Sequence, residues 1–139
     1  MGAVRASRSE RGAIAVEFAL VFPIVFAVMF GIIQYGIYFW GRSTAAASAR
    51  ESARQLAVGT DWTCSHDQAV EKANGAGSGA TASRKYLNAA NSAKIGDLVE
   101  VTVTAHSLAP DFLPLPDSGA ITEVATARVE NIPTIPLTC

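Results

Sequence analysis

The chain has 139 residues, of which half are hydrophobic and only 8% aromatic, and its net charge is −1. This length is enough for one small domain, and the charge excludes a chain-wide basic surface for nucleic acid, so no nucleic-acid partner is expected. The apolar residues are concentrated near the N-terminus instead of being spread along the chain as in a soluble enzyme.

The first segment, residues 1–12, is small, polar and basic. It holds Arg5, Arg8 and Arg11 against a single acid, Glu10. Because the segment has no hydrophobic face, we predict that it is disordered. It therefore forms a short basic leader ahead of the apolar run.

A long apolar run follows over residues 13–40. From Phe18 to Trp40 there is no charged residue, a stretch of 40 − 17 = 23 residues. A membrane-spanning helix needs about 20 residues, and this stretch would reach roughly 34 Å. Aromatic residues gather at its far end, where the membrane meets water: Tyr35, Tyr38 and Trp40. The alternative, a buried core helix, is disfavoured because the rest of the chain could not cover it.

The charges that flank the span predict its orientation. Three arginines precede it, whereas only Arg42 follows closely and the next basic residue is Arg50. Positive charge stays on the cytoplasmic side of a membrane. We therefore expect a single-pass protein of the bacterial cytoplasmic membrane, in contact with lipid, with a cytoplasmic N-terminus and an extracytoplasmic chain from about Gly41 onward.

The helical pattern continues beyond the span. Residues 42–58 are rich in alanine and contain no glycine or proline before Gly59. Small apolar residues recur at spacings of three and four, which predicts a narrow apolar face: Ala46, Ala49, Ala53, Leu56 and Ala57. We predict one long helix over residues 13–58 that crosses the membrane over about 18–40, is amphipathic over 42–58 and can kink at Pro23.

The remainder, residues 59–139, predicts a small extracytoplasmic domain. A short helix is expected over residues 66–73, and a second one over about 81–90. The glycine-rich residues 74–80 between them predict a flexible loop. The expected cap of the first helix is Thr63 or Ser65.

Strands are predicted further along. In residues 98–105 three valines alternate with polar residues, the period of a strand with one buried face. Residues 121–130 predict a second strand with a less regular phase. The proline-rich connection between them predicts a long irregular loop with hydrophobic anchors. The expected fold is α+β, with an antiparallel sheet of two to four strands packed on the second half of the long helix.

The two cysteines, Cys64 and Cys139, most simply form a disulfide outside the cytoplasm. It would close a loop of about 76 residues and contribute on the order of 4 kcal/mol. Two free thiols or an intermolecular bridge are the alternatives. His66 and His106 are far apart in sequence and there is no CxxC pair, so neither a metal nor a cofactor is expected. Ser43 and Thr44 have no adjacent His/Asp pair, so the chain is not expected to be an enzyme.

A short motif begins the apolar run: Gly12-Ala13-Ile14-Ala15-Val16-Glu17-Phe18. A lone glutamate within a spanning helix costs several kcal/mol and usually marks function. The alternative is an interfacial Glu17 that only stabilises the helix N-terminus through the helix dipole.

This motif and its continuation resemble the TadE-like proteins of the tight-adherence (Tad/Flp) pilus system. The resemblance is carried by a basic residue and Gly, then AVEFAL, a proline, FGII with a following aromatic-Gly pair, and a helix with AR-E-AR. One departure is Gln34, where family members often carry an acidic residue. The resemblance implies a pilin-like fold and a minor pilin, or pseudopilin, that takes part in pilus assembly.

The resemblance also implies a maturation step. A membrane-embedded prepilin peptidase would cut between Gly12 and Ala13, and Glu17, beside Phe18, would become the fifth residue of the mature chain. Its carboxylate would then pair with the terminal amine of a neighbouring pilin subunit at the assembly platform. The competing hypothesis is an uncut, membrane-anchored binding or scaffold protein of the cell envelope.

Overall fold

The computed structural model describes residues 6–88 and 90–132, with side chains from residue 12 onward. Two helices precede three strands, and a short 3-10 turn lies before the last strand, which confirms the α+β class. The elements are α1 (Ala6–Ala57), α2 (Trp62–Asn74), β1 (Gly77–Tyr86), β2 (Leu98–Ser107), η1 (Pro116–Gly119) and β3 (Ala120–Arg128).

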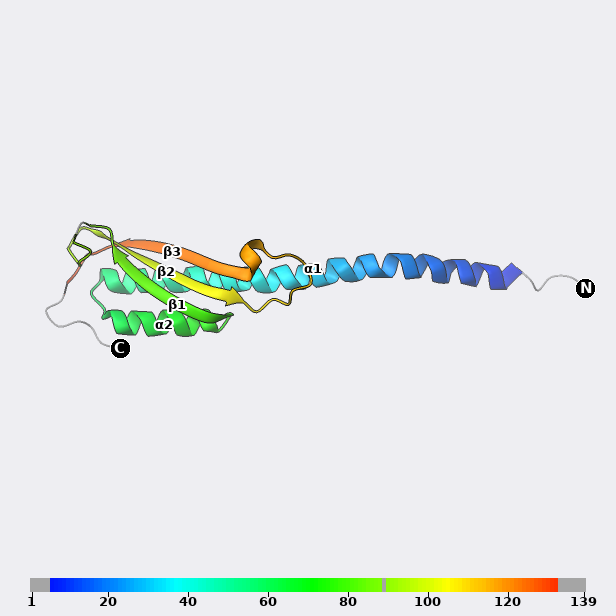
Figure 1. The fold of residues 1–139 in the computed structure, drawn as a ribbon, viewed down its shortest axis with the longest axis horizontal. Helices are drawn as coiled ribbons and strands as arrows, with labels where there is room; N and C mark the ends of the chain where they lie inside the picture. The colour runs from blue at the N-terminus through cyan, green and yellow to red at the C-terminus, as the bar shows by residue number, and fades with distance from the viewer. Residues whose placement is uncertain (1–5, 89, 133–139) are drawn as a thin grey trace, which may run out of the picture.

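Helix α1 dominates the shape of the molecule. Its N-terminal half projects alone from the domain, and its C-terminal half is packed against the sheet (Figure 1). It ends at Ala57, one residue before the predicted end, but it begins at Ala6, so the predicted disorder of residues 6–12 is wrong. A helix adds residues more easily than it nucleates, and the polar leader therefore extends a helix that the apolar run has started. The helix continues through Pro23, and the predicted kink there stays a prediction.

Helix α2 lies beside the end of α1 and forms a helical hairpin with it (Figure 1). It is longer than the predicted residues 66–73, and its cap is Asp61 instead of Thr63 or Ser65. The Asp61 carboxylate accepts a hydrogen bond from Thr63 N at 2.9 Å. Asp is a strong N-cap, because its side chain satisfies an N–H that has no partner inside the helix.

The sheet has the strand order β1-β2-β3, with both pairs antiparallel. Two of these strands match the prediction, but β1 occupies residues that were predicted to be a loop (74–80) and a helix (81–90). Alternate residues of β1, Ala80 and Ala82, turn toward the helices, so the segment has the period of a strand after all. Pairing with the valine-rich β2 outweighs the weak local helix preference of this segment.

The core lies between the sheet and the second half of α1. The inward residues Val99, Val101 and Val103 of β2 are fully buried, as the alternation predicted. Against them α1 presents Leu56 and three small residues that let the layers approach closely: Ala45, Ala49 and Ala53. The approach is also close at Gly41, where a Cβ would lie 2.9 Å from Ala76 O and 3.0 Å from Ile121 Cδ1.

Candidate functional site: the exposed half of helix α1

The residues predicted for processing, assembly and the helix kink lie together on the projecting half of α1. Residues 12–30 are all exposed, and the Phe112 ring lies against Phe30 at their C-terminal end. The helix from Gly12 to Ala57 is long and apolar enough to cross a membrane. Gly12 and Ala13 lie inside α1 near its start, and a Cβ at Gly12 would meet nothing within 4 Å. This half of the helix therefore offers its whole circumference to lipid or to other proteins.

Glu17 is the only acidic residue between Gly12 and Trp40. Among the residues whose side chains are described, none forms an ion pair or hydrogen bond with it. It lies four residues after Ala13, and residues four apart share one face of a helix. The carboxylate is thus placed one turn from the backbone nitrogen of Ala13 and is open to a partner from outside the chain.

Phe18 begins a row of phenylalanines that sequence reasoning did not single out. Its ring centroid lies 5.4 Å from that of Phe22, Phe22 lies 4.3 Å from Phe26, and Phe26 lies 5.6 Å from Phe30. A spacing of four residues produces a ridge along the helix, and such ridges pack into the grooves of neighbouring helices. The repeat of Phe at every fourth position was visible in the sequence.

The C-terminal domain is fixed to α1 by polar contacts that no sequence pattern revealed. Gln34 is fully buried and exchanges two hydrogen bonds with the backbone of Leu113, while the Tyr35 hydroxyl donates to Pro114 O at 2.9 Å. Further along, Arg42 forms an ion pair with Glu123 of β3, and this hydrogen bond raises the pKa of Arg42. These contacts therefore fix the orientation of the domain relative to α1.

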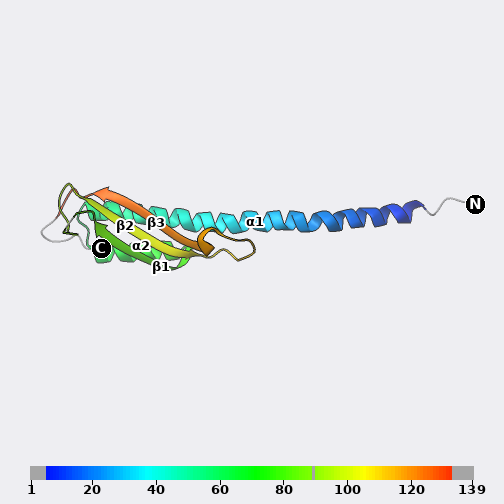
Figure 2. The ribbon, with the colours of Figure 1, turned by 45° about the horizontal axis from the view of Figure 1, so that its top comes forward.

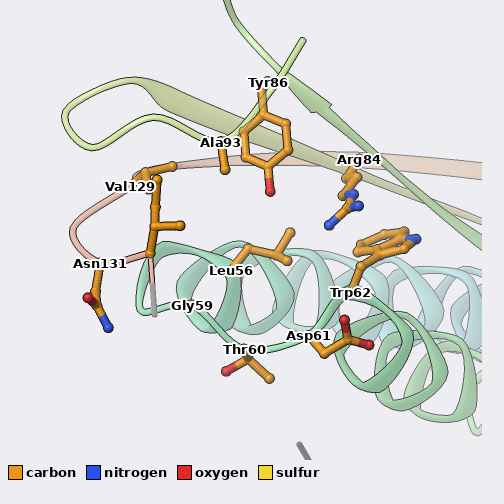
Figure 3. Close-up of a pocket in the computed structure, with 11 residues that line it drawn as sticks. Leu56, Gly59, Thr60, Asp61, Trp62, Arg84, Tyr86, Ala93, Val129 and Asn131 are labelled. Carbon is orange, nitrogen blue, oxygen red and sulfur yellow. The ribbon is translucent and has the colours of Figure 1, made fainter. Parts of the chain in front are cut away.

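A surface cavity of about 150 Å³ lies at the opposite end of the domain, where the helices turn (Figure 3). The Arg84 guanidinium lies 5.2 Å from the ring centre of Trp62 and 5.7 Å from that of Tyr86. Hydrogen bonding to the Thr63 side chain, and then to the Thr63 backbone, lowers the pKa of the nearby Asp61. The charged groups at the cavity, Asp61 and Arg84, are therefore engaged in contacts within the domain.

Of the two cysteines in the predicted disulfide, the structure describes Cys64. Cys64 is buried in α2 and accepts a hydrogen bond from Gln68 Nε2 at 3.5 Å, whereas Cys139 lies outside the described residues. The Cys64–Cys139 bridge therefore stays a prediction. Within the described part of the chain, no group of three or more His, Cys, Asp or Glu residues could hold a metal ion.

Comparison with known proteins gives one match. The family model described as TadE-like protein matches residues 12–54, from Gly12 through most of α1. No curated protein and no solved structure matches the chain. The match, and the one helix among the described residues that is apolar and long enough to span a membrane, indicate a single-pass membrane protein associated with a pilus system. The resemblance to the TadE-like family is thereby confirmed over residues 12–54, the part of the chain that the family model matches.

Proposed function

We propose that the chain is a minor pilin, or pseudopilin, that takes part in assembly of a Tad-type pilus or a related secretion apparatus. The observation that carries the proposal is the TadE-like match over a helix whose residues 12–30 are exposed and hold Glu17 as their one acid. Its partners are other pilin subunits, the assembly platform and a prepilin peptidase. The N-terminus faces the cytoplasm, and the domain from α2 to β3 lies outside.

Maturation hydrolyses the peptide bond between Gly12 and Ala13. One water is consumed, the leader leaves with a carboxylate on Gly12, and Ala13 gains a free ammonium group. A peptidase needs an extended backbone at this bond, whereas the uncut chain is helical there. Glycine costs a helix roughly 1 kcal/mol relative to alanine, so Gly12 lowers the cost of unwinding the first turns.

Assembly then pairs opposite charges in lipid. The Ala13 ammonium of one subunit and the Glu17 carboxylate of another attract strongly at low dielectric, and either charge alone is costly there. Before the cut no ammonium exists at Ala13, and the three leader arginines hold the subunit at the cytoplasmic face. Cleavage thus acts as the switch from membrane storage to assembly.

The second candidate function is an uncut envelope anchor that presents the domain for binding or as a scaffold. The specific observation that favours it is the continuity of α1 from Ala6 through Gly12, because the helical form of the bond is not a peptidase substrate. In that case Glu17 would only stabilise the start of the helix through its dipole.

The deciding experiment determines the N-terminal residue of the membrane-extracted protein, by intact mass, in cells with and without the prepilin peptidase. We expect a chain that begins at Ala13 only when the peptidase is present, and an uncut chain for Gly12→Arg. A chain that keeps its leader in both strains would contradict the proposal.

Assembly is tested separately from cleavage. Glu17→Gln should be cut normally but should no longer co-purify with neighbouring pilins. The matched control is Glu10→Gln, which removes the same charge from the leader and should leave assembly unchanged. Normal assembly of Glu17→Gln would refute the charge pairing.

A further inference from the structure

The loop that joins β2 to η1, residues 108–115, extends along α1 toward the helix N-terminus and passes the end of the sheet (Figure 1; Figure 2). Its tip contacts the helix closely. The Phe112 ring lies 5.3 Å from that of Phe30, and Leu113 Cδ1 would lie 3.1 Å from a Cβ at Gly31. The loop tip is therefore level with residues 30–34 of α1.

Those helix residues belong to the apolar run. A span of about 20 residues counted from Phe18 ends at Ile37, seven residues beyond Phe30. At about 1.5 Å per residue, Phe30 then lies roughly 10 Å inside the membrane boundary. A span counted from Ala13 instead ends at Ile32, which still includes Phe30. Either way, Phe112 reaches the depth of the outer leaflet.

The side chains at the loop tip suit that depth. Two of them are apolar and exposed, namely Phe112 (64%) and Leu113 (40%), and Leu108 (53%) is exposed at the start of the loop. In water such a cluster would be unfavourable, since burial of apolar surface stabilises by roughly 25 cal/mol per Å². Acyl chains around the adjacent helix would cover these side chains without any change in the fold.

Polar groups of the loop backbone also have hydrogen-bond partners within the protein, as a membrane environment with little water requires. Irregular backbone is tolerated at membrane depth only where its polar groups are satisfied by protein. Gln34 satisfies both the N–H and the C=O of Leu113, and Phe112 N donates to Pro110 O. The prolines at 110, 114 and 116 have no N–H to satisfy.

We propose that residues 108–115 form an interfacial membrane anchor, with Phe112 and its apolar neighbours inserted among the lipids of the outer leaflet. Asp111 limits the depth, because a carboxylate at the bilayer centre costs several kcal/mol, so it stays at the headgroups while Phe112 points into the chains. The extracytoplasmic domain is then held on the membrane at two places, by α1 and by this loop. The inference needs the membrane span but not cleavage of the leader.

The test measures the depth of residue 112 in the full-length protein, diluted into phosphatidylcholine vesicles. Trp40→Phe and Trp62→Phe remove the native tryptophans, and Phe112→Trp then introduces a single reporter. Lipids brominated near the headgroup, at mid-chain or at the chain end quench its fluorescence according to depth. We expect strong quenching by bromines in the upper part of the chain.

Two further single-tryptophan variants serve as references for the depth of position 112. Ile32→Trp replaces an exposed residue of the span and should be quenched at least as strongly as Phe112→Trp. Leu87→Trp replaces an exposed residue that follows β1 at the far end of the domain and should not be quenched. Quenching of Phe112→Trp no greater than that of Leu87→Trp overturns the proposal.

A second measurement covers the case in which Trp at position 112 disturbs the loop. A photoreactive benzophenone amino acid at position 112 should form adducts with lipid on illumination, detected by mass spectrometry. Adducts only with a second copy of the chain, and none with lipid, would overturn the proposal in favour of a subunit contact.

Discussion

Gln34 and Leu113 are 79 residues apart in sequence but are joined by two hydrogen bonds, from Gln34 Nε2 to Leu113 O at 2.6 Å and from Leu113 N to Gln34 Oε1 at 2.9 Å. One side-chain amide thus satisfies the N–H and the C=O of a single loop residue. The Gln34 side chain is fully buried. The pair connects the apolar run of α1 to the loop that follows β2, and it fixes where the loop meets the helix.

The first prediction concerns this pair. Gln34→Leu leaves the Leu113 N–H and C=O without partners, which costs about 1–3 kcal/mol. Hydrogen exchange of the loop peptide, measured by mass spectrometry in vesicles, should accelerate about tenfold or more, since 1.4 kcal/mol corresponds to a factor of ten. Ile33→Leu changes the exposed neighbour and should leave the exchange rate unaltered. Equal exchange in both variants would show that the pair does not hold the loop.

The second prediction compares two glycines of α1. Gly41→Ala places a methyl group against Ala76 O and Ile121 Cδ1 and should lower the free energy of unfolding by about 1–3 kcal/mol. Gly36→Ala meets no atom within 4 Å and should be neutral or stabilise the helix by up to about 1 kcal/mol. Thermal unfolding in detergent, followed by circular dichroism, checks both. A melting temperature for Gly41→Ala at or above that of Gly36→Ala would contradict the close approach of helix and sheet.

The third prediction tests which face of the sheet is buried. Val101→Ala removes two methyl groups from a fully buried side chain of β2 and should cost about 2 kcal/mol. Val124→Ala makes the same change on β3, where the side chain is 53% exposed, and should alter stability by at most about 0.5 kcal/mol. Denaturant titration of the two variants in the same detergent distinguishes them. Similar losses would contradict the assigned core.

The fourth prediction concerns the cysteines. If Cys64 and Cys139 are bridged, the intact mass of the unreduced protein should be lower by two hydrogens than that of the reduced protein. Reduction, or Cys139→Ser, should cost on the order of 4 kcal/mol, because the bridge closes a loop of about 76 residues. A monomer that is labelled by a thiol reagent at both cysteines after unfolding without reductant would exclude the bridge.

The sequence predicted those features that depend on local periodicity. The helix end was predicted to within one residue of Ala57, and the buried valines of β2 were predicted, because spacings of three to four and of two can be read directly from the sequence. The strand β1 was missed since glycine, alanine and serine have little preference of their own, and pairing with β2 decides their conformation. The cap at Asp61 was missed because three hydroxyl or acidic residues compete within five positions.

In the candidate site, too, some residues could be predicted from the sequence and others could not. Gly12 and Glu17 were singled out because a charge inside an apolar run is visible without a structure. The partnership of Gln34 with Leu113 was not predictable, since nothing near Gln34 in the sequence indicates which distant backbone will meet its amide. Gln34 was noted only as a departure from the family pattern, whereas the structure assigns it a contact that closes the fold.

Because α1 is one helix from the exposed phenylalanine ridge to the buried alanines of the domain, rotation about its axis is shared by both halves. A neighbouring subunit that packs on the ridge within lipid would therefore also set the rotational orientation of the domain about the α1 axis, some tens of ångströms further along the helix. If the α1 helices of two such subunits pack together, their domains cannot rotate independently of each other. Contact between helices in the membrane would thus dictate the pattern that the domains display at the surface.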